Sequence, residues 1–423
     1  MPSLARIAAE PARPAPPTRW ARLRAAVDAR ASWIPAIFVL AALADEIVSR
    51  SRVGPDFAVF HRAAARFVAG EPLYRLSDGH FCFKYAPAAA ALLSPLAALP
   101  ARAAEIAFNA ASAVALLAFM RFAAGGPRAA RGALASTAAT LYAMPLYTML
   151  FFLGQSDALL LAAVVGSELS AERRPSLSGA LWAVAIVFKP PMVLLAAVAV
   201  GFRQWRRLGW GVGWTVALLA ASALRYGVAG GLHELAAWRT LLAGTTAPLL
   251  CDPQNQSVLA VACSFVATPE RPGAFRAAVA LLGGGVAAAM AASVWSVARR
   301  DRELARRLAF MGALYLAAFL SPLGWRVNLL AALPLLHVAL GLVRGASRRW
   351  LRVASLAAVA LWIGVGNTMS DRILGPRAVE ALMLGRFWAL GALAIALLAT
   401  CGTALEARAT PVDRPPKQPG SRR

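Results

Sequence analysis

The sequence predicts an all-α, polytopic membrane protein, and three observations support this fold class. The chain has 423 residues, of which 59% are hydrophobic and only 15% are charged, whereas charged residues make up about a quarter of a typical soluble domain. Apolar stretches long enough to approach the thickness of a bilayer recur from Trp33 to Cys401. The arginines gather in the tails and in the turns between these stretches, which is typical of multi-pass membrane proteins.

The apolar stretches define the expected spans, because a membrane helix needs about 20 apolar residues. The clear candidates are 33–48, 103–120, 133–153, 208–229, 274–298, 308–321, 324–343, 351–369 and 385–403. Region 156–202 is broken by charged residues and prolines, and we expect three short helices there; one kinked helix over 177–202 is the alternative. Segment 86–99 is short and flanked by proline. If it dips into the outer leaflet without crossing, the chain has about 12 spans.

The charge distribution predicts the orientation. The turns 299–307 and 344–352 are rich in arginine, so they and both termini are expected in the cytoplasm of a cell with the protein in its inner or plasma membrane. The loops 49–85 and 230–273 are then outside. The tails 1–31 and 404–423 are basic and rich in proline and alanine, so we expect them to be disordered. The transmembrane domain would cover 32–403, and the net charge of +24 indicates contact with membrane lipids and not with nucleic acid.

The sequence contains no pattern that predicts a metal or a cofactor. The four histidines form no paired motif and the four cysteines show no metal-ligand spacing. No glycine-rich nucleotide loop is present. Cys82 and Cys251 both fall on expected outer loops, so they either form a disulfide or remain unpaired as small apolar side chains.

An amphipathic segment on the first outer loop carries the residue of greatest interest, Asp56. From Asp56 to Ala69 the apolar residues recur at helical spacing, and Arg62 and Arg66 lie one turn apart. This pattern predicts an interfacial helix along the outer leaflet. Asp56 follows Gly54-Pro55, so it either caps this helix or does chemistry at the membrane surface.

Several short motifs then follow in order over about residues 53–330. The first outer loop has Gly70, the run Pro72-Leu73-Tyr74, Tyr85 and Pro87 behind Asp56. Later motifs are Gly154-Gln155, Lys189-Pro190, Asn255-Gln256-Ser257 and the run from Ser321 to Trp325. In this order the set resembles glycosyltransferase family 87, whose members are polytopic, polyprenyl-phosphate-mannose-dependent mannosyltransferases of the GT-C superfamily.

The resemblance implies a GT-C type bundle that moves a sugar, expected to be mannose, from a polyprenyl-phosphate donor to a lipid or glycan acceptor on the outer face. Asp56 matches the position of the general base, which takes a proton from the acceptor hydroxyl. Cations would neutralise the phosphate leaving group, and amides and carboxylates would hold sugar hydroxyls. The candidate substrate-binding residues are Arg62, Lys84, Tyr85, Gln155, Asp157, Lys189, Asn255, Gln256, Arg326 and Asn328.

The chain departs from the family after the run Ser321 to Trp325, where the family commonly carries histidine and this chain has Arg326, Val327 and Asn328. Arg326 or Asn328 would take over part of that role, or the activity is changed or lost. An alternative from another class is a transporter or flippase of a lipid-linked sugar. Transporters often contain internal repeats, and none is visible in this sequence.

Overall fold

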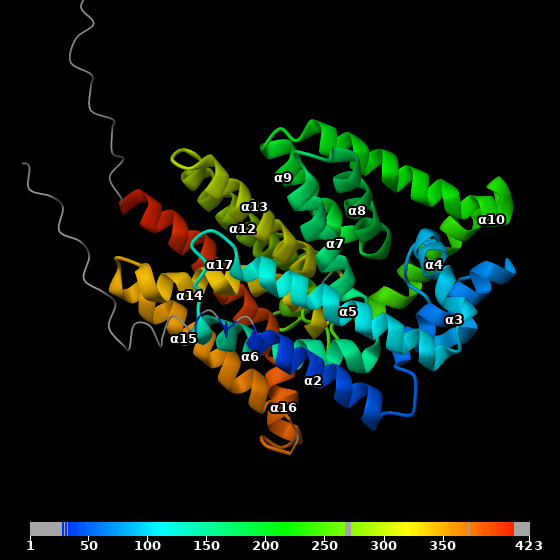
Figure 1. The fold of residues 1–423 in the computed structure, drawn as a ribbon, viewed down its shortest axis with the longest axis horizontal. Coiled ribbons are helices and arrows are strands. Elements are labelled where there is room, and N and C mark those ends of the chain that lie inside the picture. The colour runs from blue at the N-terminus through cyan, green and yellow to red at the C-terminus, as the bar shows by residue number, and fades with distance from the viewer. Residues whose placement is uncertain (1–27, 29, 32, 267–271, 371, 410–423) are drawn as a thin grey trace, which may run out of the picture.

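The computed structural model of the chain describes residues 28, 30–31, 33–266, 272–370 and 372–409, and every regular element within them is a helix. Figure 1 shows these helices packed into one bundle. The prediction of an all-α membrane protein is confirmed. The predicted tails lie almost wholly outside the described residues.

Seven helical segments of the described ranges are long and apolar enough to cross a membrane. They are α5 (Ala101–Ala124), α6 (Ala133–Leu153), α10 with η4 (Trp205–Leu249), α12 (Pro272–Ala298), η5 with α14 (Arg326–Gly345), α15 (Arg349–Thr368) and α17 (Phe387–Ala409). Two further helices, α2 (Trp33–Ser49) and α13 (Arg302–Phe319), coincide with predicted spans but are shorter or more charged. The total of about 12 spans stays a prediction.

The region 156–202 forms three short helical units, as predicted. These are α7 (Asp157–Ser170), α8 (Pro175–Phe188) and the pair η3–α9 (Pro190–Leu194 and Leu195–Gly201). Lys189 leaves the helical region with φ −132° and ψ 90°, because the proline that follows it disfavours a helical conformation. The alternative of one kinked helix over 177–202 is therefore wrong.

The amphipathic segment of the first outer loop is helix α3 (Pro55–Ala69), and its buried face includes Phe57, Phe60 and Ala64. The interpretation of Asp56 as the helix cap is wrong: Gly54 occupies that position and Asp56 lies in the first turn. Segment 86–99 forms α4 (Pro87–Leu93) and η2 (Ser94–Ala98), which pack against α3. At about 1.5 Å per residue these helices are too short to cross a bilayer.

Two predicted boundaries differ from the structure. Helix α10 continues to Thr246, well into the predicted outer loop 230–273, and changes direction at Gly227, where φ is 71°. Helix α17 continues to Ala409, so residues 404–409 belong to the bundle and not to a disordered tail. The apolar stretch of the sequence ends before each of these helices does. Hydropathy does not take account of polar side chains that form hydrogen bonds or ion pairs in the fold. A short helix, α11 (Val258–Cys263), also lies in the predicted outer loop 230–273, and another, α16 (Pro376–Leu384), lies between the predicted spans 351–369 and 385–403.

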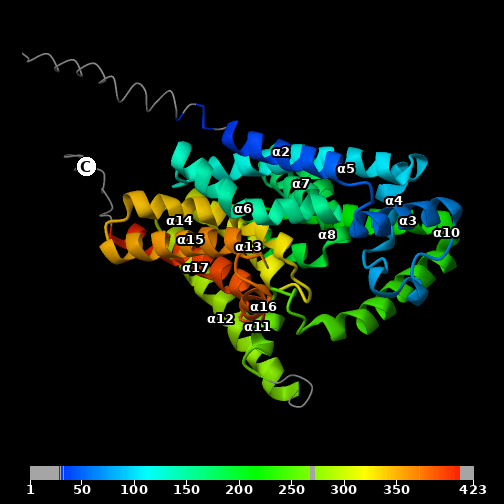
Figure 2. The same ribbon diagram turned by 90° about the horizontal axis from the view of Figure 1, so that it is seen from below.

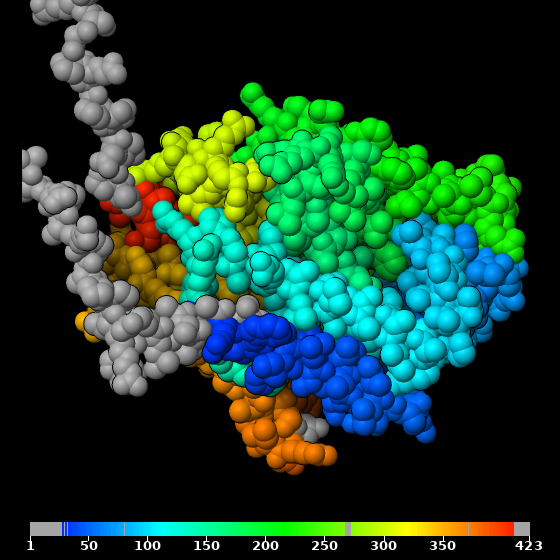
Figure 3. All heavy atoms as spheres, viewed as in Figure 1, coloured from blue at the N-terminus to red at the C-terminus, as the bar shows by residue number. Residues whose placement is uncertain are grey.

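The helices form two groups that follow the chain order. In Figure 2, α2 and α5–α8 lie together along one side, and α12–α17 lie beside them. Contacts of η3 and α9 with α13, and of α6 with η5 and α15, join the groups. Fully buried aromatic rings, among them Tyr142 and Trp362, fill the core. Figure 3 shows α2 on the outside of the molecule, where Trp33, Ile37 and Val48 are exposed.

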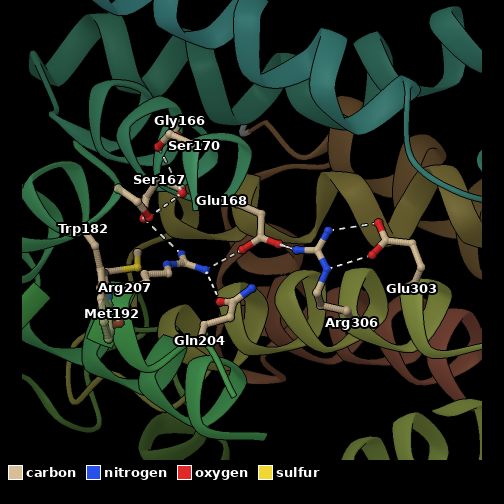
Figure 4. A network of polar contacts seen from close by, with 11 residues as sticks. Gly166, Ser167, Glu168, Ser170, Trp182, Met192, Gln204, Arg207, Glu303 and Arg306 are labelled. Carbon is tan, nitrogen blue, oxygen red and sulfur yellow. Dashed lines mark hydrogen bonds and ion pairs between the residues drawn. The ribbon is translucent and has the colours of Figure 1, made fainter. Parts of the chain in front are cut away.

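A buried charge cluster joins three helices at the end of α7. Glu168 accepts a hydrogen bond of 2.6 Å from Nη1 of Arg207 on α10 and is also paired with Arg306 on α13. Arg306 in turn contacts Glu303. Figure 4 shows Glu168 between the two guanidinium groups. The side chains of Arg207 and Glu168 are only 1% and 6% exposed, so each needs the other in place.

We expect Glu168→Gln to lower the free energy of unfolding by about 3 kcal/mol, because it leaves the buried Arg207 without a counter-charge. Glu303→Gln is the matched control. Its side chain is 53% exposed, so the change should cost less than about 1 kcal/mol. Thermal unfolding of the purified protein, followed by tryptophan fluorescence, checks both. Equal midpoints for the two variants would contradict a structural role of the buried cluster.

Candidate active site

The position of Asp56 depends on a close approach between α3 and the end of α6. Gly154 ends α6 with φ 72°, a left-handed conformation that glycine adopts most readily. A Cβ atom at Gly154 would lie 2.4 Å from the Cβ of Phe57, so a larger residue has no room there. The next residue, Gln155, donates a hydrogen bond from Nε2 to Oδ2 of Asp56. The turn after α6 therefore sets both the position and the orientation of the carboxylate.

The start of α3 is also anchored to α5. The backbone N–H of Gly54 donates a 2.6 Å hydrogen bond to Oε1 of Glu105, and Arg102 pairs with the other oxygen of that carboxylate at 2.6 Å. The Glu105 side chain is fully buried. Because a buried, paired carboxylate is costly to displace, this contact holds the first turn of α3 rigidly beside the bundle.

Asp56 lines a cavity of about 360 Å³, which we call the aspartate cavity. Its polar lining consists of Asp56, Lys84, Tyr85, Gln155, Gln254 and Arg326. The predicted base thus shares one chamber with four of the predicted binding residues. Gln254 was not predicted, although it directly precedes the Asn255-Gln256-Ser257 motif, which was the available signal.

A second cavity of about 690 Å³ adjoins the first, and we call it the apolar cavity. Lys84, Tyr85, Gln155 and Trp325 line both cavities. Most of the remaining wall comes from the regions 188–193, 238–246 and 317–331. Its side chains include Phe188, Pro190, Met192, Trp238, Leu242 and Leu323. The apolar wall and the polar junction together suit a ligand with one lipid-like and one polar part.

One polar cluster lies in the wall of the apolar cavity. Asp157, in the first turn of α7, accepts a 2.6 Å hydrogen bond from Nζ of Lys189 and a 2.7 Å hydrogen bond from Nδ2 of Asn328 on the same oxygen, Oδ1. The structure thus brings together three of the predicted residues, from the start of α7, the end of α8 and η5. Lys189, one of the predicted binding cations, is thus paired with Asp157, and its role in substrate binding stays a prediction.

Lys84 and Arg326 are the cations of the aspartate cavity, and neither side chain has a hydrogen bond or an ion pair to any described residue. Nε of Arg326 is buried without a partner, and its guanidinium carbon lies 5.6 Å from the centre of the Trp388 ring. Tyr85 lies between the two cavities, and burial raises the pKa of its phenol far above the usual value. Tyr85 is therefore a neutral hydrogen-bond donor at physiological pH.

Three predicted binding residues line neither cavity. Nη2 of Arg62 donates to the carbonyl of Phe81, and its Nε lies 3.8 Å from Asp78. Asn255 is fully buried and donates from Nδ2 to the carbonyls of Leu250 and Pro322. Gln256 bonds to the backbone of Pro253 and Ala389. These side chains organise the predicted outer loops beside the two cavities, and a direct role in substrate binding stays a prediction.

The predicted outer loop 230–273 contains a disulfide that differs from the predicted possibility. Cys251 is bonded to Cys263, with a Cα–Cα distance of 5.6 Å, and Cys82 is buried with a free thiol. The Cys82–Cys251 pairing is therefore wrong. Cys251 and Cys263 are 12 residues apart in the sequence. No pattern in the sequence indicated that they lie close together, because their contact depends on the tertiary structure of this loop.

Residues 83–322 of the chain match glycosyltransferase family 87. This match covers more than half of the 423 residues. The chain belongs to glycosyltransferase family 87. Family membership shows that this multi-pass membrane protein is a glycosyltransferase. The recognition from the ordered motifs is thus confirmed.

One solved structure, described as ArnT from Cupriavidus metallidurans bound to undecaprenyl phosphate, is similar to this glycosyltransferase at 18% sequence identity. The TM-score is 0.40, and the match covers 88% of this chain and 78% of the other. No curated protein matches the chain significantly.

We expect Gly154→Ala to lower sugar transfer by this glycosyltransferase about tenfold or more, because displacement of a catalytic group by about 1 Å has effects of this size. The new methyl group forces the first turn of α3 away from α6. Gly201→Ala is the control, since a Cβ there meets no atom within 4 Å. Equal turnover in the two variants, measured on membranes with equal protein content, would show that the close approach does not position the site.

Proposed function

We propose that this protein transfers a sugar from a polyprenyl-phosphate donor to a lipid or glycan acceptor on the outer face of the membrane, with Asp56 as general base. One observation carries the proposal. The carboxylate of Asp56 lines the same cavity of this family 87 chain as Lys84 and Arg326, two cations that form no ion pair with any described residue. The mannose specificity suggested by the family resemblance is part of the proposal.

The proposed reaction uses the three groups in distinct ways. The acceptor oxygen forms a bond to the anomeric carbon of the donor sugar while the bond from that carbon to the phosphate oxygen breaks. Asp56 takes the proton of the acceptor hydroxyl. The polyprenyl phosphate leaves with an additional negative charge, and the ammonium of Lys84 and the guanidinium of Arg326 stabilise it. Gln155 holds Asp56 in place.

The two cavities suggest how the donor lies. Lys84 lines both of them, so a phosphate beside Lys84 would sit at their junction. The isoprenoid chain would then extend along the apolar cavity, past Phe188 and Leu242, and the sugar would lie toward Asp56. Asp157, Lys189 and Asn328 would face the donor from the wall and contact it through hydrogen bonds.

The departure from the family at Arg326 fits this arrangement. An arginine stays protonated at physiological pH, so it cannot shuttle a proton as a histidine does. Its planar guanidinium can instead bind a phosphate with two parallel hydrogen bonds. In this proposal Asp56 alone handles the proton, and Arg326 acts on the leaving group.

We expect Asp56→Asn to lower transfer by on the order of a hundredfold or more, because it removes the base and keeps the size of the side chain. The assay incubates the purified protein with radiolabelled polyprenyl-phosphate mannose and a lipid extract and follows label in the product. Glu71→Gln removes an exposed carboxylate that pairs with Arg75 on the same outer segment, and its turnover should not change. Near-normal turnover in Asp56→Asn would refute the proposed base, and label that changes membrane side without entering a new bond would favour a transporter.

The cations are tested by donor binding. Lys84→Met and Arg326→Lys should each weaken the binding of polyprenyl phosphate about tenfold, since a hydrogen bond to a charged group contributes roughly 1.5–3 kcal/mol. Arg75→Gln is the matched control, because it removes a cation that pairs with Glu71 and lines neither cavity. Binding is measured by the quenching of tryptophan fluorescence. If Arg75→Gln weakens binding as much as the other two variants, the phosphate is not held where we propose.

A further inference from the structure

A third cavity lies at the opposite end of α7 from the candidate active site. Helix α7 begins at Asp157, in the wall of the apolar cavity, and ends at Ser170. Its 14 residues span about 20 Å. The third cavity lies where α7 leads into α8, beside the turn from α9 to α10 and the start of α13, and its volume is about 610 Å³. It therefore faces the membrane surface opposite to Asp56.

We call this space the arginine cavity because five arginines line it. They are Arg203, Arg206, Arg207, Arg302 and Arg306. The acidic residues of the lining are Glu172 and Glu303. Positive charge is in excess in a concave site at the end of a membrane bundle, and this charge attracts anions.

Two of these arginines are held in fixed positions. Glu168 pairs with both Arg207 and Arg306, and Ser167 Oγ accepts a 3.0 Å hydrogen bond from Nη2 of Arg207. Figure 4 shows these contacts and the further pair between Arg306 and Glu303. Nε of Arg207 is buried and has no hydrogen-bond partner among the described residues. The back of the cavity is thus built from preorganised guanidinium groups.

The other three arginines, Arg203, Arg206 and Arg302, are exposed, and no ion pair joins them to a described residue. Arg203 follows α9 with φ 60°, a position after a helix that glycine usually occupies. Trp205 also lines the cavity and is 57% exposed, as is typical of tryptophans at the level of lipid headgroups. The mouth of the cavity therefore combines unpaired cations with an interfacial aromatic ring.

We propose that the arginine cavity binds the phosphate of an anionic phospholipid headgroup from the leaflet opposite to Asp56. The exposed arginines would bind the phosphate oxygens through charge-assisted hydrogen bonds, and basic pockets between membrane helices bind anionic headgroups in this way. Its volume lies within the usual range for a bound small ligand, about 300–1,000 Å³. The bound lipid would join α7, α10 and α13 and stabilise the folded protein by mass action. This inference does not depend on the proposed reaction.

The test compares lipid binding by two double variants of the full chain in detergent. Arg203→Gln with Arg206→Gln removes two unpaired charges from the cavity. Arg349→Gln with Arg352→Gln is the matched control, because both arginines are exposed at the start of α15 and line none of the three cavities described here. Native mass spectrometry measures the binding of phosphatidylglycerol, with phosphatidylcholine as the neutral reference.

We expect the native protein to prefer phosphatidylglycerol, and the cavity variant to bind it roughly 25-fold more weakly, at about fivefold per arginine. The control variant should bind it as the native protein does. Arg302→Gln changes a different helix and should weaken binding about fivefold, which keeps the test informative if the double variant folds poorly. Equal binding by the cavity and control variants would overturn the proposal. So would binding of free glycerol phosphate as tight as that of the lipid, because the site would then take a soluble anion.

Discussion

The partners that buried carboxylates find in the fold are the constraint on which this structure depends. Asp157 pairs with Lys189 near the candidate active site, and Glu168 pairs with Arg207 at the far end of α7. Glu105 pairs with Arg102 of its own helix and accepts a hydrogen bond from the backbone of Gly54 before α3. An isolated charge in a protein or lipid interior is expensive. The pairs of Asp157 and Glu168 therefore require their helices to stay in register, and the buried Glu105 holds the start of α3 beside α5.

The same constraint decides which cations remain available for a ligand. Lys189 is neutralised by Asp157, and Arg66 is held by Asp78 in a two-pronged contact of 2.5 and 2.9 Å. The Arg66 guanidinium lowers the pKa of Asp78, so this pair stays ionised and closed at neutral pH. Lys84 and Arg326 have no such partner within the described part of the chain, and both line the cavity of Asp56. A leaving phosphate would meet these two cations without first breaking an ion pair, which keeps the cost of binding low.

The replacement of the family's histidine by Arg326 becomes understandable in this setting. Arg326 lies at the first turn of η5, directly after Trp325, and packs over Trp388. The aromatic ring supports the guanidinium through a cation–π contact, and Arg326 also lines the aspartate cavity. A fixed cation at this point favours stabilisation of charge over transfer of protons. Proton transfer in the proposed reaction then depends on the carboxylate of Asp56, which Gln155 orients.

Much of the fold was predictable from hydropathy alone, because the bilayer demands long apolar helices and basic residues between them. Hydropathy and the breaks at Arg173-Arg174-Pro175 and Lys189-Pro190 determined the helices of 133–153 and 156–202, and the ordered motifs determined the family. Only the tertiary structure decided that α10 continues to Thr246 and that Asn255 organises a loop. It also decided that Lys189 pairs with Asp157, whereas Lys84 forms no ion pair with the residues that the structure describes. The physical reason is that hydropathy and helix breaks are local properties of the chain, whereas the availability of a charged side chain depends on which distant residue the fold places beside it.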